Sequence, residues 1–144
     1  MTTGEFDAGA SDKAEIDRLI AAFFALFDNR GGVRPDLDRI FAMFTADGRI
    51  TRVEGAEARQ WSLEAFIAPR RDLLCGGGLD DFCEQESGEQ TWIEGRLASR
   101  ISRYRKAGRL HGQPYAGGGT KLFQLVRGAD GWRIAAMCWE DEAD

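Results

Sequence analysis

The sequence predicts an α+β domain in which the helices come first and an antiparallel sheet follows. Helical periodicity dominates as far as about residue 75, and strand-like segments follow one another from about residue 82. The strongest local signal is the closing hairpin, where strand-forming residues at 120–127 and 132–140 flank a turn at 128–131. This segregation of helices from strands is typical of α+β folds and argues against a doubly wound parallel sheet.

The first elements expected are a tail and two helices. Residues 1–10 are small, polar and glycine-containing, which predicts a loosely held tail before a single domain at 11–144. Asp12 and Glu15 have capping-box spacing, and Asn29 lies in the stretch that ends the first helix. Between them, apolar residues recur at helical spacing at Ile16, Leu19, Ile20, Phe23, Phe24 and Phe27. A second helix is expected from Pro35, with an apolar stripe at Leu37, Ile40, Phe41 and Phe44.

The middle of the chain predicts one short strand and a third helix. Residues 49–53 alternate polar and apolar side chains, and a polar loop is expected after them. Ser62 is placed to cap a helix that buries Phe66 and Ile67. Pro69 is expected to break or kink this helix, because proline lacks a backbone N–H and clashes with the preceding turn.

Four strands are expected to complete the sheet in antiparallel succession. Residues 82–93 predict a long strand, in which an irregularity can fall at 87–88, and residues 97–104 predict its partner. Residues 107–119 are expected to form a long glycine-rich loop before the closing hairpin. In the last strand, Trp132 and Ile134 should share one face and Met137 and Trp139 the other, unless a bulge intervenes. One of these faces would then look outward and offer an interface.

Composition limits the classes of partner. The chain has 144 residues, of which 43% are apolar, and its net charge of −5 comes with cations and acids interleaved, so we expect no nucleic-acid surface. No apolar run approaches the ~20 residues of a membrane-spanning helix. The three cysteines lack metal-ligand spacing, and no basic region precedes an apolar stretch at the N-terminus. We therefore expect a reduced, cytoplasmic protein with no metal and no cofactor.

Four segments together resemble a known superfamily: the Phe-rich first helix, the exit from the second helix at 44–48, the strand at 97–104 and the ending at 123–134. Over about residues 11–142 the chain resembles the nuclear transport factor 2-like superfamily, the cystatin-like cone that includes SnoaL-like polyketide cyclases and ketosteroid isomerase. The resemblance implies N-terminal helices packed in the concavity of a strongly curved, mainly antiparallel sheet. It also implies an apolar pocket open at one end and a homodimer formed through the outer face of the sheet.

The catalytic residues of ketosteroid isomerase-like members do not transfer to this chain. Those members use a tyrosine in the first helix and an aspartate on the first strand. This first helix offers only Phe23, Phe24 and Phe27, and Arg52 stands at about the place of the acid. The isomerase interpretation is weakened accordingly.

Candidate polar residues gather on two predicted strands. Arg100, Ser102 and Tyr104 share a face, and Glu84 or Glu86 on the neighbouring strand is the expected partner of Arg100. In a pocket, the pair with Tyr104 as a donor could polarise a substrate oxygen or orient a carboxylate. On the surface, the same pair would be a cross-strand ion pair worth ~0–1 kcal/mol. The two glutamates also share a face, which leaves open a raised carboxyl pKa and general-acid catalysis.

Two further candidate groups are the only histidine and a set of aromatic side chains. His111 could act as an acid or base near neutral pH, or it is an exposed loop histidine; alone, it does not predict a metal site. The aromatic residues could wall a pocket, or they form core or interface. They are Phe27, Trp61, Phe66, Phe123 and Trp139.

The sequence leaves two functions open. One is a cofactor-free SnoaL-like isomerase, cyclase, dehydratase or hydrolase that uses acid–base residues in an apolar pocket on a small apolar or carbonyl-bearing organic ligand. The other is a non-catalytic dimeric binding or assembly module. Polar side chains that converge in a cavity would favour the first, and polar side chains paired at the surface would favour the second.

Overall fold

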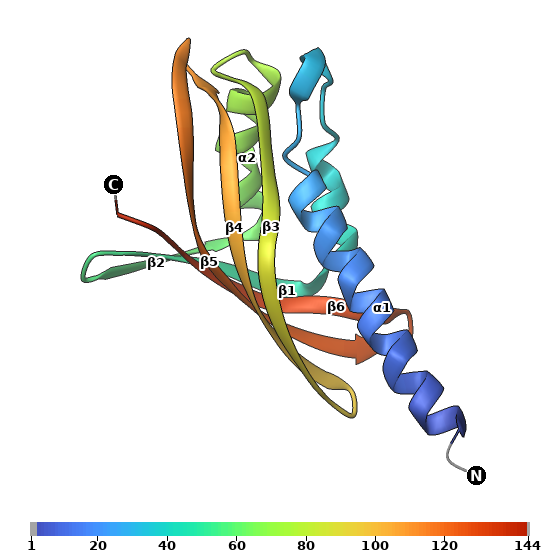
Figure 1. Ribbon diagram of the computed structural model, residues 1–144. Helices are drawn as coiled ribbons and strands as arrows, with labels where there is room; N and C mark the ends of the chain where they lie inside the picture. Colours follow the sequence, from blue (N-terminus) through green and yellow to red (C-terminus); the bar gives the residue numbers. More distant parts are fainter. Residues whose placement is uncertain (1–2, 144) are drawn as a thin grey trace.

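A curled six-stranded sheet wraps the helices in the computed structural model, which describes residues 3–143 and the side chains from residue 9 onwards (Figure 1). The helices are α1 (Thr3–Ala25) and α2 (Leu63–Cys75), with short 3₁₀ segments at Arg30–Gly32 and Leu37–Ala42. The strands are β1 (Phe44–Glu54), β2 (Glu57–Ser62), β3 (Leu79–Glu94), β4 (Leu97–Leu110), β5 (Gln113–Gly128) and β6 (Gly131–Asp141). The sheet order is β2-β1-β6-β5-β4-β3. The predicted α+β class is confirmed.

The last four strands pair in antiparallel succession, as expected, and β1 joins them through a parallel pairing with β6. The closing hairpin turns between Gly128 and Gly131, and a register shift between Glu86 and Gly88 matches the expected irregularity in β3. None of the helices in the described part of the chain is long and apolar enough to cross a membrane.

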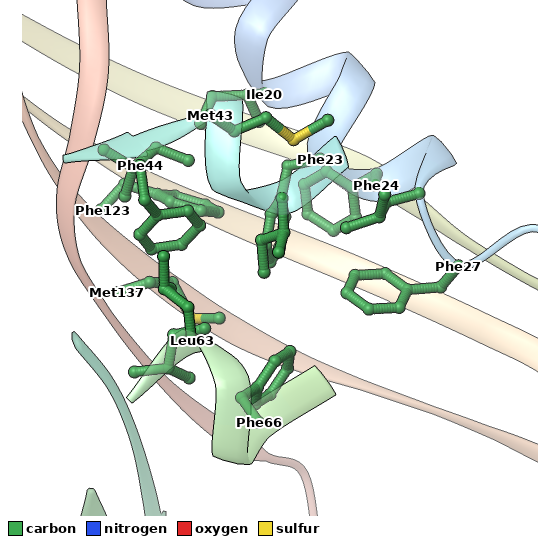
Figure 2. Packing of buried hydrophobic residues seen from close by; sticks show 14 of the residues in the cluster. Ile20, Phe23, Phe24, Phe27, Met43, Phe44, Leu63, Phe66, Phe123 and Met137 are labelled. Carbon is green, nitrogen blue, oxygen red and sulfur yellow. The ribbon is translucent and has the colours of Figure 1, made fainter. Parts of the chain in front are cut away.

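Phenylalanines of α1 and of the segment that follows it fill the concave face of the sheet. Phe23 is fully buried and makes edge-to-face contacts with Phe123 of β5 and Phe27, at centroid distances of 5.5 and 5.4 Å. Phe27 in turn meets Phe66 of α2 at 6.2 Å. Figure 2 shows these rings gathered between the sheet and α2. Aromatic burial of this kind dominates the stability of a small core, and the apolar spacing read from the sequence predicts the face that does it.

Helical boundaries differ from those expected. α1 begins at Thr3, so residues 3–10 are helical, while residues 1–2 lie outside the described residues. Whether this first stretch is loosely held stays a prediction. The second expected helix is only a 3₁₀ segment at Leu37–Ala42, and α2 continues through Pro69 to Cys75.

The strands are more extensive than expected, because two predicted loops are hairpins. The polar loop after residue 53 is a turn at Gly55, with φ of 61°, that leads into β2. The predicted loop at 107–119 is wrong as well: β4 and β5 stay paired until Leu110 meets Gln113. Its glycines lie in a strand because β5 approaches its neighbours closely, so glycine richness does not indicate a loop there.

A bulge in β6 changes the expected facing of its side chains. Leu125 pairs with Ile134 but Gln124 pairs with Ala136, so Ala135 is an extra residue. The alternation restarts after it, and the aromatic and apolar residues on both sides of the bulge are buried: Trp132, Ile134, Met137 and Trp139. Neither pair looks outward, so β6 does not provide the expected outer strip.

Asn29 joins three segments through its buried side chain. Its Nδ2 donates to Leu74 O at 2.9 Å and to Leu79 O at 2.7 Å, and its Oδ1 accepts from Phe82 N–H at 2.8 Å. The side chain therefore satisfies backbone groups at the end of α2 and the start of β3, where no regular secondary-structure partner is in reach.

We predict that Asn29→Ala lowers the free energy of unfolding by about 3–5 kcal/mol, because three buried backbone groups lose their partner. Asn29→Asp keeps the acceptor and should lose less at a pH where the carboxyl is protonated. Urea unfolding followed by circular dichroism measures both. A loss below ~1 kcal/mol for the alanine variant would show that water or backbone rearrangement replaces these bonds.

Candidate functional site

A cavity of about 240 Å³ lies between α2, the end of α1 and the concave face of the sheet. Most of its wall is apolar. The apolar and aromatic side chains that line it are Phe23, Phe27, Phe66, Pro69, Leu73, Leu74, Leu79, Phe82, Tyr104, Tyr115 and Trp139. The wall is well suited to an organic molecule with a flat apolar body.

One end of the cavity holds a buried ion pair. Lys121 Nζ of β5 lies 2.8 Å from Glu84 Oε1 of β3, and the two side chains are only 7% and 11% exposed. This contact makes Lys121 the ionic partner of Glu84. Burial lowers the pKa of Lys121, and Glu84 only partly offsets this effect. The ammonium also lies 4.2 Å from the centroid of the Tyr104 ring.

A second polar group surrounds Asp141 at the end of β6. The Tyr104 hydroxyl donates to Asp141 Oδ1, which Lys106 Nζ also contacts at 3.2 Å. Arg52 Nη2 lies 3.3 Å from Oδ2. Burial would raise the pKa of Asp141, but the Tyr104 hydroxyl, Lys106 and Arg52 outweigh it and lower this pKa. Burial and the Asp141 carboxylate raise the pKa of Tyr104 far above its usual value of 10.0, so the phenol keeps its proton.

Glycine at position 119 is required for this arrangement. A Cβ on Gly119 would stand 2.6 Å from Tyr104 Oη and would overlap the Glu140 carbonyl oxygen. Because Gly119 has no side chain, the Tyr104 hydroxyl can pass over β5 and donate its hydrogen bond to Asp141.

The third polar group of the cavity is the single side chain of Arg70 in α2. Its guanidinium lies 3.6 Å from the centroid of the Phe66 ring, and its Nη1 donates to Phe66 O at 2.9 Å. Burial lowers the pKa of Arg70 to about 10, so it remains cationic at neutral pH.

The structure brings some of the predicted site residues together in the cavity. Glu84 and Tyr104 line it, as do three of the five predicted aromatic residues, Phe27, Phe66 and Trp139. Phe123 is fully buried in the core against Phe23, and Trp61 stacks on Trp139 at 5.8 Å from outside the lining.

Arg100 and Glu86 form the predicted pair, but they lie under α1 and outside the cavity lining. Arg100 is 3% exposed, and its Nη2 lies 2.6 Å from Glu86 Oε1 while its Nη1 lies 2.6 Å from Asp17 Oδ1 of α1. Ser102 Oγ donates to Glu86 Oε2 at 2.5 Å. The burial of Arg100 excludes the exposed-pair alternative. These contacts clamp α1 to β3 and β4.

His111 lies at the exposed tip of the β4–β5 hairpin and does not line the cavity. Its backbone has φ of 49°, and its backbone N–H donates to Gly78 O at 2.7 Å. Among the described residues, no group of three or more His, Cys, Asp or Glu side chains is placed to hold a metal ion.

Sequence reasoning missed most of the charged residues of the cavity. Lys121 alternates with Phe123 and Leu125 along β5, and this period of two was a usable signal for an inward side chain. Tyr115 lies in the predicted loop at 107–119, and Lys106 lies beyond the predicted end of the strand at 97–104, so neither was expected to face inward. Asp141 faces inward only because of the bulge at Ala135, and no local sequence pattern predicts that bulge.

No protein-family model and no curated protein matches the chain, but solved structures do. A nuclear transport factor 2-like superfamily protein from Salmonella enterica aligns with a TM-score of 0.75 at 12% identity, over 94% of each chain. The chain has the nuclear transport factor 2-like fold. The resemblance inferred from the sequence is confirmed at this level.

Two further structures share this nuclear transport factor 2-like fold. A protein from Kribbella flavida aligns with a TM-score of 0.74 at 21% identity, over 94% of this chain and 93% of the other. A type 2 hexachlorocyclohexane dehydrochlorinase (LinA) aligns with a TM-score of 0.72 at 14% identity, over 96% of this chain and 90% of the other. At these identities the comparison establishes architecture and transfers no residue role.

We predict that Asp141→Asn lowers the free energy of unfolding at neutral pH by roughly 1–3 kcal/mol, because hydrogen bonds to a charged acceptor are weakened. The native pKa of Asp141 lies below its usual 3.8, so its contribution is complete above pH 3.8 and is lost as pH falls through the native value. The difference between wild type and variant should therefore close in that acidic range. Urea unfolding at stepped pH measures it.

The matched control is Glu142→Gln, which removes the exposed neighbouring carboxylate that lies 3.3 Å from Arg105. This change should cost at most ~0.5 kcal/mol at any pH. A gap between Asp141→Asn and wild type that stays constant down to the lowest pH would contradict the lowered pKa.

Proposed function

We propose that this protein binds a small carbonyl-bearing or apolar organic molecule in the cavity and catalyses a cofactor-free acid–base reaction on it. Isomerisation, cyclisation, dehydration and hydrolysis are the reaction classes in question. The supporting observation is that Glu84, Lys121 and Tyr104 converge in a cavity with aromatic walls. Charged residues are costly to bury in such a wall, and titratable groups held in an apolar cavity are a usual mark of a functional site.

The proposed chemistry assigns the base to Glu84 and the donors to Lys121 and Tyr104. Glu84, a carboxylate held beside the Lys121 ammonium in the cavity, takes a proton from a carbon next to a carbonyl group. The electron pair moves onto the carbonyl oxygen, and the Lys121 ammonium stabilises the developing negative charge. In a carbonyl compound with a β,γ double bond the enolate extends to the γ carbon, and return of the proton from Glu84 to that carbon gives the conjugated isomer, with no atom left over.

Lys121 and Tyr104 suit different parts of this task. The lowered pKa of Lys121 makes its ammonium a stronger acid than an ordinary lysine. Tyr104 is held by Asp141 and keeps its proton, so it can orient a ligand through its ring and hydroxyl without ionising. In this proposal Arg100 and Glu86 support the site by fixing α1, and His111 has no part.

The location of the protein stays a prediction. Cys75, Cys83 and Cys138 are all free thiols, which supports a reducing, cytoplasmic environment. The name of one structural neighbour, hexachlorocyclohexane dehydrochlorinase, is that of an enzyme, and it supports an enzymatic use of this fold.

The proposed acid–base function is tested by hydrogen–deuterium exchange at the carbon next to the carbonyl of a small ketone such as cyclohexanone, followed by NMR in deuterated buffer. Wild type should accelerate exchange over buffer, and Glu84→Gln should lower the rate by about 100-fold or more. Glu86→Gln is the matched control: it should lower stability by releasing Arg100 but leave the exchange rate within about two-fold.

Equal loss of exchange in the two variants would contradict the assignment of the base to Glu84. The catalytic proposal would be contradicted if wild type accelerates hydrogen–deuterium exchange for no ketone of a series and if none of these ketones raises its melting temperature.

A second candidate, the dimeric binding or assembly module, is favoured by the outer face of the sheet. Trp92 of β3, Leu97 of β4 and Leu122 of β5 are 54%, 61% and 40% exposed. Their pairings place them on the face opposite the buried Ala98 and Arg100. An apolar patch on a sheet face suits a homodimer interface.

We predict that the wild-type protein sediments as a dimer and that Leu122→Glu shifts it to monomer, because the change buries a carboxylate within the patch. Val33→Glu is the control, since Val33 is 62% exposed but lies outside the sheet. Sedimentation velocity distinguishes the two species. A monomeric wild type at all practical concentrations would exclude this interface.

A further inference from the structure

The cavity carries an excess of positive charge in an otherwise acidic protein. Its charged lining consists of the cations Arg52, Arg70, Lys106 and Lys121 and the carboxylates Glu84 and Asp141. Four cations against two anions leave two positive charges, whereas the whole chain has a net charge of −5. A low-dielectric recess lined by one sign of charge concentrates ligands of the opposite sign.

Three of the four cations have an anionic partner. Lys121 is paired with Glu84 at 2.8 Å, and Lys106 and Arg52 contact Asp141 at 3.2 and 3.3 Å. Arg52 also reaches Glu54 at the rim, at 2.9 Å. The two carboxylates of the cavity are therefore committed to these neighbours.

Arg70 is the cation left over. Among the side chains from residue 9 onwards, no carboxylate lies within ion-pair distance of its guanidinium. Its contacts are the Phe66 carbonyl oxygen at 2.9 Å, the Phe66 ring at 3.6 Å and the Trp139 ring at 5.7 Å. A guanidinium has five N–H donors in a planar fork, and one carbonyl oxygen satisfies only a fraction of them. Arg70 is partly buried, so holding its charge against these rings without an anionic partner is costly, and an anionic ligand in the cavity would offset part of that cost.

The shape and polarity of the cavity limit the ligand further. Its volume of about 240 Å³ lies below the ~300–1,000 Å³ typical of sites for drug-sized ligands, which favours a small molecule. The wall is mostly aromatic and aliphatic, so one charged group on an apolar body fits better than a polyanion. Arg70 and Lys121 lie 5.7 and 5.5 Å from the same Trp139 ring, so a ligand lying along this indole can contact both cations.

We infer that Arg70 is an anion-binding residue of the cavity and that the ligand is a small organic carboxylate with a flat apolar body. The carboxylate binds the Arg70 guanidinium through its planar fork, and the apolar body packs against Phe66 and Trp139. This inference rests on the proposed function, because it names the class of molecule on which Glu84 and Lys121 would act.

The test compares phenylacetate with its neutral analogue phenylacetamide by isothermal titration calorimetry. Wild type should bind the acid at least about ten-fold more tightly than the amide, since the two ligands differ only in the charged group. Arg70→Met keeps an unbranched side chain over Phe66 and removes the charge. It should weaken phenylacetate about ten-fold or more and leave phenylacetamide within about two-fold.

Arg71→Met is the matched control on the same helix, because Arg71 lies outside the cavity lining and is paired with Asp38 at 2.5 Å. It should change the affinity for neither ligand. Arg70→Lys keeps the charge without the fork and should retain part of the preference for the acid. If Arg70→Met does not fold, the comparison of acid with amide on wild type and on Arg70→Lys still decides the question.

The other possible results of these binding measurements lead to different conclusions. Equal binding of acid and amide by wild type would overturn the inference and leave the proposed function standing. A preference for the acid that survives Arg70→Met would overturn the assignment to Arg70. Inorganic phosphate that competes as well as phenylacetate would overturn the ligand class. No binding of either aromatic probe would overturn the inference and count against a ligand cavity altogether.

Discussion

The hydrogen bonds of one buried amide determine where the helical and strand layers meet. Asn29 binds backbone groups of Leu74, Leu79 and Phe82, and all three residues also line the cavity. The end of α2 and the start of β3 are thus held at a fixed separation, with the chain that leaves α1 between them. Because the Asn29 amide makes hydrogen bonds to these backbone groups, they need no further strand or helix as a partner. The cavity can therefore remain between α2 and the sheet at this end.

The cavity shows how a small fold can keep charge inside an apolar wall. Each anion in it has a cationic partner. Asp141 contacts Lys106 and Arg52 and also accepts from the neutral Tyr104 hydroxyl, and Glu84 is paired with Lys121. Such groupings reduce the cost of removing ions from water, but they rarely add net stability over apolar packing. Their presence in an aromatic-walled cavity supports the proposed function.

Local pattern predicted the fold class and most elements, while long-range geometry decided the site. The apolar spacing of Phe23, Phe24 and Phe27 is readable because it depends on helical period alone. Strand alternation placed Arg100 and Tyr104 on one face but did not decide which way that face points, and the structure buries both side chains. Which of them reaches the cavity depends on the curl of the sheet and on α1 lying over Arg100, and neither is encoded in a short window. The glycines at 117–119 led to the wrong prediction of a loop. Glycine is favoured in loops, but it is also favoured in a strand whose backbone lies very close to its neighbours, as in β5.

The extra residue in β6 has a consequence for how the sequence of this protein can diverge. Ahead of Ala135, the strand supplies the core with Trp132 and Ile134; beyond it, the same strand supplies the cavity with Trp139 and Asp141. Loss of that single residue would rotate the second half of the strand by one step and turn its indole and carboxylate to the outside. A one-residue deletion at Ala135 would therefore remove Trp139 and Asp141 from the cavity wall.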